Sequence, residues 1–112
     1  MIIYMQNINY TNPIIGKITD ANPDTFIIFF VQECPYCQKA LHLLRNSGVA
    51  YKGYDINSIN GNMPRLLDTL NQYSYLTNFN SNHNTKPIIF INGKFLGGST
   101  ELAQYLSNQF TY

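Results

Sequence analysis

Cys34 and Cys37, which enclose a Pro-Tyr dipeptide, constrain this chain more than any other feature and are its only cysteines. They follow an apolar run at residues 26–31, typical of a buried strand, and precede an apolar-periodic stretch at residues 40–44, which predicts a helix. The first sulfur is therefore expected at a helix N-terminus, where free N–H groups and the helix dipole favour a thiolate. Such a pair can close and reopen a small disulfide ring by reversible two-electron exchange.

Composition and charge exclude several classes of partner. The 112 residues are enough for one domain with one core, and the net charge of +1 comes without any basic run. A surface that tracks phosphates is therefore not expected, and we expect no nucleic-acid partner. No apolar stretch reaches the roughly 18 residues that span a bilayer, so we also expect no membrane partner.

The N-terminal residues and the cysteine count indicate a cytoplasmic, reducing compartment. Residues 1–6 have no positive flank and no long apolar run, so they do not resemble a signal peptide. In a reducing compartment, cysteines at this spacing are more often catalytic or metal-binding than structural. Zinc needs four ligands, but His42 is expected on the surface of its helix and His83 in a solvated loop, so we expect no metal.

Hydrophobic periodicity along the chain predicts an alternation of helices and strands. A helix between the first two strands makes them parallel, and Asn92-Gly93 between two apolar runs is a strong hairpin signal. The prediction is an α/β fold with a four-stranded mixed sheet flanked by helices. The expected elements are a helix from Pro13, a strand at 26–31, a helix from Cys34 to near Asn46, a strand at 49–56, a loop at 57–62, a helix from Pro64, a strand at 87–91, a strand at 94–96 and a capped helix from Ser99 to near Asn108.

We expect residues 1–112 to form a single domain. Residues 1–12 are interpreted as an N-terminal arm, with a short strand at residues 1–10 as the alternative. Residues 73–84 are polar, aromatic and rich in asparagine, and are interpreted as the end of a helix followed by a loop insertion.

Three segments, in this order, resemble glutaredoxins of the thioredoxin fold. The first covers residues 29–37 and matches the strand and the CPYC active site of dithiol glutaredoxins. The second, Thr-Lys-Pro at residues 85–87, is similar to the Thr-Val-Pro of the family, whose proline follows a cis peptide bond. The third, residues 89–98, is similar to the hairpin and glycine pair of the family. The resemblance covers about residues 25–108 and implies a thioredoxin-like fold.

The resemblance also implies glutathione as a cosubstrate, with Cys34 as the nucleophile and Cys37 as its partner. In the family, the tripeptide backbone pairs with the residue before the cis-proline, and the γ-glutamyl carboxylate lies at the start of the helix after the glycine pair. That location suits an anion on physical grounds as well, because a helix N-terminus presents free N–H groups. The residues thereby implied in glutathione binding are Tyr36, Thr85, Lys86, Pro87, Gly98, Ser99 and Thr100.

Two positions depart from the family pattern around the nucleophile. Val31 occupies a position where many relatives have a lysine that assists thiolate formation, and Glu33 places a negative charge directly before Cys34. A neighbouring negative charge disfavours a thiolate. Lys86 replaces the commoner valine, and we hypothesise that its ammonium partly substitutes for the missing lysine.

These features predict a glutathione-dependent thiol–disulfide oxidoreductase. We expect a monomer that reduces protein disulfides and glutathione mixed disulfides, with disulfide-containing or glutathionylated proteins as partners. Two alternatives remain open: a [2Fe–2S] cluster-binding glutaredoxin that acts as carrier or sensor, and a redoxin dedicated to one client protein. Pro35 argues against the cluster, whose binders often have glycine or serine there, and a brown colour on anaerobic purification would reveal it.

Overall fold

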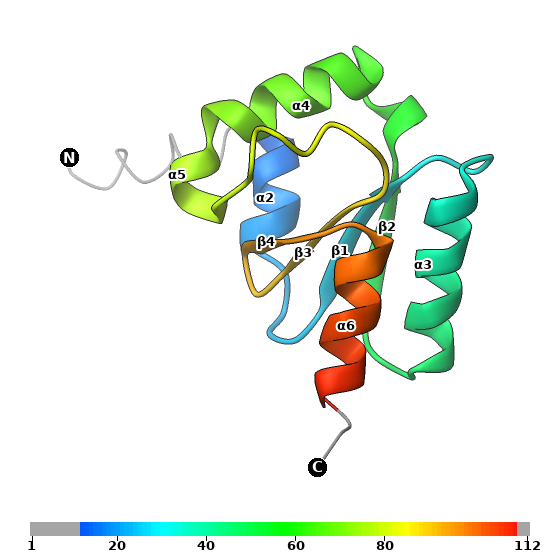
Figure 1. Ribbon diagram of the computed structural model, residues 1–112. Coiled ribbons are helices and arrows are strands. Elements are labelled where there is room, and N and C mark those ends of the chain that lie inside the picture. Colours follow the sequence, from blue (N-terminus) through cyan, green and yellow to red (C-terminus); the bar gives the residue numbers. More distant parts are fainter. Residues whose placement is uncertain (1–11, 110–112) are drawn as a thin grey trace.

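The computed structural model describes residues 12–109, and its four strands form one mixed sheet in the order β2-β1-β3-β4 (Figure 1). β1 is parallel to β2 and antiparallel to β3, and β4 is antiparallel to β3. The predicted four-stranded mixed sheet is therefore confirmed. The strands are β1 (Phe26–Phe30), β2 (Tyr51–Asp55), β3 (Ile88–Ile91) and β4 (Lys94–Gly97).

Helices cover both faces of this sheet, as predicted (Figure 1). Alternate residues of β1 point to opposite faces, so Ile27 and Phe29 contact the α2 and α4 side while Phe26 and Ile28 contact the α3 and α6 side. Within residues 12–109 no helix is both long enough and apolar enough to span a membrane. The helices are α2 (Pro13–Thr19), α3 (Pro35–Asn46), the 3₁₀ turn η1 (Ile56–Ser58), α4 (Asn62–Gln72), α5 (Ser74–Thr77) and α6 (Ser99–Gln109).

Local sequence signals account for the start of α2 and for the hairpin. The Asn12 side chain accepts hydrogen bonds from the N–H groups of Ile14 and Ile15 at 3.0 and 3.1 Å, which caps α2. Asn92 and Gly93 both have positive φ, 50° and 79°, which a two-residue type I′ hairpin requires. This turn places β4 beside β3 and brings the glycine pair to the end of the sheet.

The connection after β2 differs from the expected loop. Residues 56–58 form a 3₁₀ turn, and α4 begins at Asn62 rather than at Pro64. Gly61 makes this earlier start accessible because its φ is +93°, and a Cβ there would lie only 2.6 Å from Arg65 Cβ. Pro64 is tolerated in the first turn, where an N–H has no helical partner in any case.

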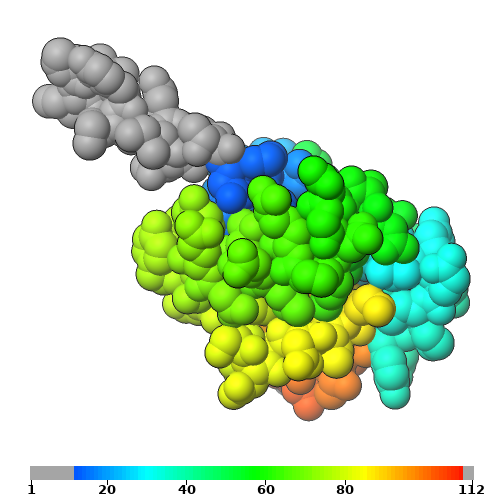
Figure 2. Space-filling model, turned by 90° about the horizontal axis from the view of Figure 1, so that it is seen from above, coloured from blue at the N-terminus to red at the C-terminus, as the bar shows by residue number. Residues whose placement is uncertain are grey.

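The segment from 73 to 84 contains the short helix α5 before it becomes a loop. Asn78 ends α5 in the left-handed conformation with φ 61°, and Lys94 Nζ donates to the Leu76 carbonyl at 2.8 Å. Figure 2 shows the yellow part of the chain, after α5, lying on the surface beside α4, with one end next to the cyan segment that begins α3. The predicted arm at residues 1–12 lies outside the described residues except for Asn12.

Candidate active site

Cys34 and Cys37 occupy very different environments at the start of α3. Cys34 is the N-cap of the helix and is partly exposed, and its Sγ accepts a hydrogen bond from the Cys37 N–H at 3.2 Å. Pro35 takes the first helical position, where its fixed φ suits the helix and its missing N–H is not needed. Cys37 lies within the first turn and is completely buried. A substrate can therefore reach the first sulfur and not the second.

Burial keeps Cys37 in its protonated form. Removal from water, and after it the hydrogen bond to the Cys34 sulfur, raise the pKa of the Cys37 thiol to about 12. The N–H of Val31, 3.5 Å from Cys37 Sγ, and the positive charge of Lys86 act in the opposite direction but are outweighed. Because the thiolate is the nucleophilic form, Cys34 is the sulfur suited to attack a disulfide.

The backbone at residues 85–87 faces the exposed sulfur. The Lys86–Pro87 peptide bond is cis, as predicted, and the Lys86 carbonyl oxygen lies 3.8 Å from Cys34 Sγ. Cys34 and Lys86 lie 52 positions apart in the chain and belong to two separate sequence motifs. The fold therefore places the cis-proline backbone directly beside the cysteine.

A groove of 460 Å³ continues from this contact to the start of α6. It contains every residue that the family resemblance implied in glutathione binding, together with two residues that sequence reasoning did not assign to the site. We call it the ligand groove. Its lining residues are Tyr36, His83, Thr85, Lys86, Pro87, Gly98, Ser99, Thr100 and Glu101.

The start of α6 forms the far end of the ligand groove. Gly98 is the capping residue, because its carbonyl accepts from the Leu102 N–H and its N–H donates to Glu101 Oε1 at 2.8 Å. The helix begins at Ser99 as predicted, and the Glu101 carboxylate accepts from the N–H of the capping residue, as the acidic residue of a capping box does. Gly97 adopts φ +141°, and a Cβ there would lie 2.6 Å from Glu101 Cγ. Glu101 could have been found from the capping pattern, but its place in the groove depends on the fold.

His83 corrects one of the expectations from sequence. It was expected to be solvated in its asparagine-rich loop, but its ring is half-buried and lines the ligand groove. Its Nε2 lies 3.2 Å from the Pro87 carbonyl, and the ring packs edge-on against Phe95 with centroids 5.1 Å apart. No local signal predicts this position, because the aromatic partner belongs to a distant strand. His42, by contrast, is exposed on α3 as predicted, with Nε2 2.8 Å from Asn46 Nδ2.

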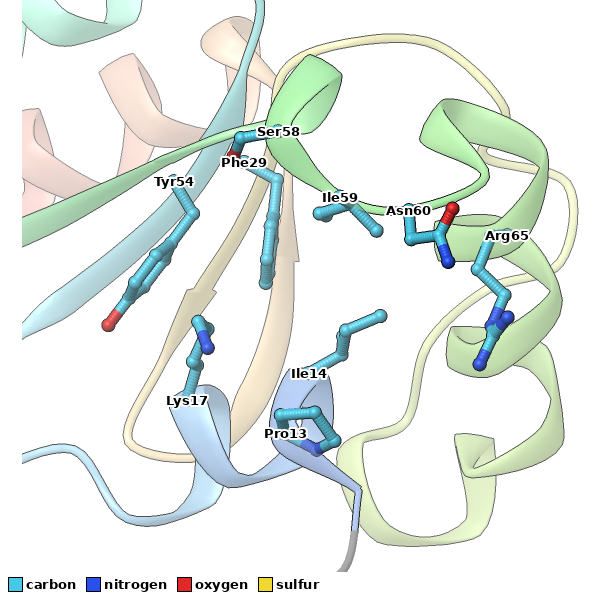
Figure 3. Close-up of a pocket in the computed structure, with 9 residues that line it drawn as sticks. All are labelled: Pro13, Ile14, Lys17, Phe29, Tyr54, Ser58, Ile59, Asn60 and Arg65. Carbon is cyan, nitrogen blue, oxygen red and sulfur yellow. The ribbon is translucent and has the colours of Figure 1, made fainter.

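A second hollow, of 320 Å³, lies among α2, β2 and the start of α4, on the opposite face of the sheet from α3 (Figure 3). Ile14, Phe29 and Ile59 give it apolar walls, while Lys17 and Arg65 lie at its two sides. Neither cysteine lines it. Within residues 12–109, no three His, Cys, Asp or Glu side chains gather as a metal-binding group. The redox chemistry therefore belongs to the ligand groove.

A parallel β1–β2 pair joined by a helix, a cysteine at the start of that helix and a cis-proline beside it define a redox protein of the thioredoxin-like fold. The chain belongs to the glutaredoxin family, whose model, described as Glutaredoxin, matches residues 26–96. It is therefore a glutathione-dependent thiol–disulfide oxidoreductase.

Known proteins support this assignment in sequence and in structure. A probable glutaredoxin of Acanthamoeba polyphaga mimivirus is 62% identical over 102 residues, which cover 91% of this chain and 96% of that protein. Glutaredoxin 1 of Francisella tularensis, crystallised with cacodylate, is 27% identical with a TM-score of 0.64, over 76% of this chain and 94% of that one. A buckwheat glutaredoxin–glutathione complex shares the fold, with a TM-score of 0.67 at 20% identity over 85% of this chain and 76% of that one.

Proposed function

We propose that this protein reduces glutathione mixed disulfides and protein disulfides through the Cys34–Cys37 dithiol. The observation that carries the proposal is the difference between an accessible sulfur and a buried, protonated one, beside a groove that collects every expected glutathione-binding residue. The buckwheat relative, whose structure is a complex with glutathione, supports this choice of ligand.

In the route that uses one cysteine, the Cys34 thiolate attacks the glutathione sulfur of a protein–glutathione mixed disulfide. The old S–S bond breaks, the protein leaves as a thiolate that takes up a proton, and glutathione becomes joined to Cys34. The thiolate of a second glutathione then attacks that glutathione sulfur. Oxidised glutathione leaves, and Cys34 returns to its thiolate form.

In the route that uses both cysteines, Cys34 attacks a protein disulfide and forms a mixed disulfide with one of its sulfurs. Cys37 then loses its proton and attacks the Cys34 sulfur, which releases the second protein thiol and leaves a Cys34–Cys37 disulfide. The hydrogen bond to the Cys34 sulfur is one cause of the raised pKa of Cys37, after burial. Converting Cys34 to a mixed disulfide weakens that cause, so Cys37 becomes easier to deprotonate at the step that needs it.

The ligand groove would orient glutathione for this exchange, which needs three sulfurs nearly in line. Lys86 offers its backbone to the cysteinyl unit, and the first N–H groups of α6 offer a location for the γ-glutamyl carboxylate. The Lys86 side chain is exposed, lines the groove, and lies close enough for its charge to lower the pKa of Cys37. These observations support Lys86 as a partial substitute for the cation that is missing at Val31.

Turnover of a glutathionylated protein tests the proposal, with glutathione and glutathione reductase as the electron supply. We expect steady turnover by a monomer, under the conditions of a reducing compartment. Turnover only with thioredoxin reductase in place of glutathione would instead favour a redoxin dedicated to one client. A coloured protein after anaerobic purification, without turnover, would favour the cluster carrier.

A further inference from the structure

We propose that His83 supplies a titratable positive charge to the ligand groove, so that its imidazolium form binds glutathione more tightly than its neutral form. The inference rests on the proposed function, since it concerns the same groove. It assigns a role to a side chain that the thiol chemistry itself does not use.

The surroundings of the ring hold it in one orientation. Nε2 lies 3.2 Å from the Pro87 carbonyl oxygen, which can only accept, so Nε2 carries a proton in the neutral ring as well. Phe95 and Phe79 pack against the imidazole with ring centroids 5.1 and 6.5 Å away. Protonation therefore occurs at Nδ1, which has no hydrogen-bond partner among residues 12–109, and it changes the charge without requiring a new orientation.

The edge of the ring that carries both nitrogens faces the start of α6. Cε1, the carbon between the two nitrogens, lies 3.5 Å from the position that a Cβ would take on Gly98. Gly98 caps α6, and Ser99 and Thr100 form its first turn. A positive imidazole here would add to the field of the helix N-terminus at the same point where an anion is favoured.

The other charged side chains that line the ligand groove cancel, so the protonation of His83 sets the net charge of the lining. Glu101 on α6 and Lys86 beside the cis-proline contribute one negative and one positive charge, and Phe79 and Phe95 behind the ring are uncharged. The lining side chains sum to zero with a neutral His83 and to +1 with the imidazolium, while the Cys34 thiolate, beside the Lys86 carbonyl at the other end of the groove, is the same in both cases. Glutathione carries two carboxylates and one ammonium, so the imidazolium form attracts it.

The affinity for S-methylglutathione, measured by calorimetry, tests this inference. That ligand has no thiol to exchange with Cys34, and Cys34 is present in every variant compared, so its ionisation contributes equally to all of them. We expect the Kd of the wild-type protein to be about three to ten times lower at about pH 5.5 than at about pH 7.5, the range in which imidazole changes its charge. His83→Gln is expected to remove this dependence, whereas His42→Gln, the matched change of the exposed histidine, is expected to keep it.

A second readout uses the wild-type protein and so does not depend on whether a variant folds. Because coupling is reciprocal, binding of S-methylglutathione should raise the midpoint pH in the titration of the His83 Cε1–H resonance. The rise should equal the logarithm of the ratio between the affinities of the imidazolium and neutral forms. An affinity that does not change with pH, or a resonance that does not move, would overturn the inference alone. Absence of S-methylglutathione binding at either pH would overturn the proposed function together with it.

Discussion

At the end of the ligand groove next to Cys34, the contacts of the two sulfurs join neighbours in sequence, apart from the approach of the Lys86 carbonyl to Cys34 Sγ. Pro35 begins α3, and the N–H of Cys37 donates to the Cys34 sulfur three positions away. On the side that carries His83, the ring is fixed by Phe95 on β4 and by the carbonyl that follows the cis bond. The difference suggests that sulfur reactivity is set locally, whereas ligand affinity is set by tertiary packing. Changes on the first side are then expected to alter chemistry, and changes on the second to alter binding.

The largest effect is expected from Cys34→Ser. The hydroxyl cannot replace the nucleophilic thiolate, so turnover of a glutathionylated protein should fall below detection while the fold remains. A coupled assay with glutathione reductase measures the loss, and an unchanged thermal unfolding transition provides the control. Substantial turnover by this variant would mean that another group attacks the mixed disulfide.

Cys37→Ser is expected to separate the two routes. Reduction of glutathione mixed disulfides should continue, because that route needs only the Cys34 sulfur. Reduction of a protein disulfide by the two-cysteine route should be lost, because a serine hydroxyl cannot resolve the intermediate joined to Cys34. Parallel assays with the two kinds of substrate measure this split, and an equal loss on both would refute the distinct roles of the two sulfurs.

Gly97→Ala tests the packing on the binding side. The new Cβ would meet Glu101 Cγ at 2.6 Å and Cβ at 2.7 Å, so we expect a loss of about 1–3 kcal/mol in the free energy of unfolding. Gly93→Ala is the matched control, since its φ is also positive, at +79°, but a Cβ there meets nothing within 4 Å. Urea unfolding measures both variants. Equal losses would show that Glu101 does not constrain Gly97.

Lys86→Met is expected to have the smallest effect. The change keeps the length of the side chain and the backbone that is proposed to pair with glutathione, but it removes the charge. The KM for glutathione should therefore rise about two- to five-fold at low salt. The difference from the wild-type protein should shrink as salt screens the charge. An unchanged KM at low ionic strength would leave only the Lys86 backbone in contact with the ligand.

The same division between local and tertiary contacts explains what the sequence could predict. The residues of β1 and α3 could be predicted because a run that is apolar on both faces and an apolar-periodic stretch at residues 40–44 are local signals. The capped start of α6 was also predicted from residues that are neighbours in sequence. The cis bond and the glutathione residues came from the family resemblance rather than from local propensity.

The position of His83 depended on contacts that no local pattern contains. The burial of His83 follows from the meeting of two chain segments, since the ring lies against Phe79 and Phe95 only after β4 is in place. A polar, asparagine-rich stretch therefore indicated a solvated loop, although one of its side chains lines the ligand groove.

Alkylation of the reduced, folded protein by iodoacetamide tests the central claim most directly, with mass spectrometry to locate the modified sulfur. Cys34 is partly exposed, whereas Cys37 is buried with a pKa raised to about 12. At about pH 7, we expect a single modification, on Cys34, and protection of Cys37 until the protein is unfolded. Modification of Cys37 at a comparable rate, or before Cys34, would contradict the division of the pair into an attacking and a resolving sulfur.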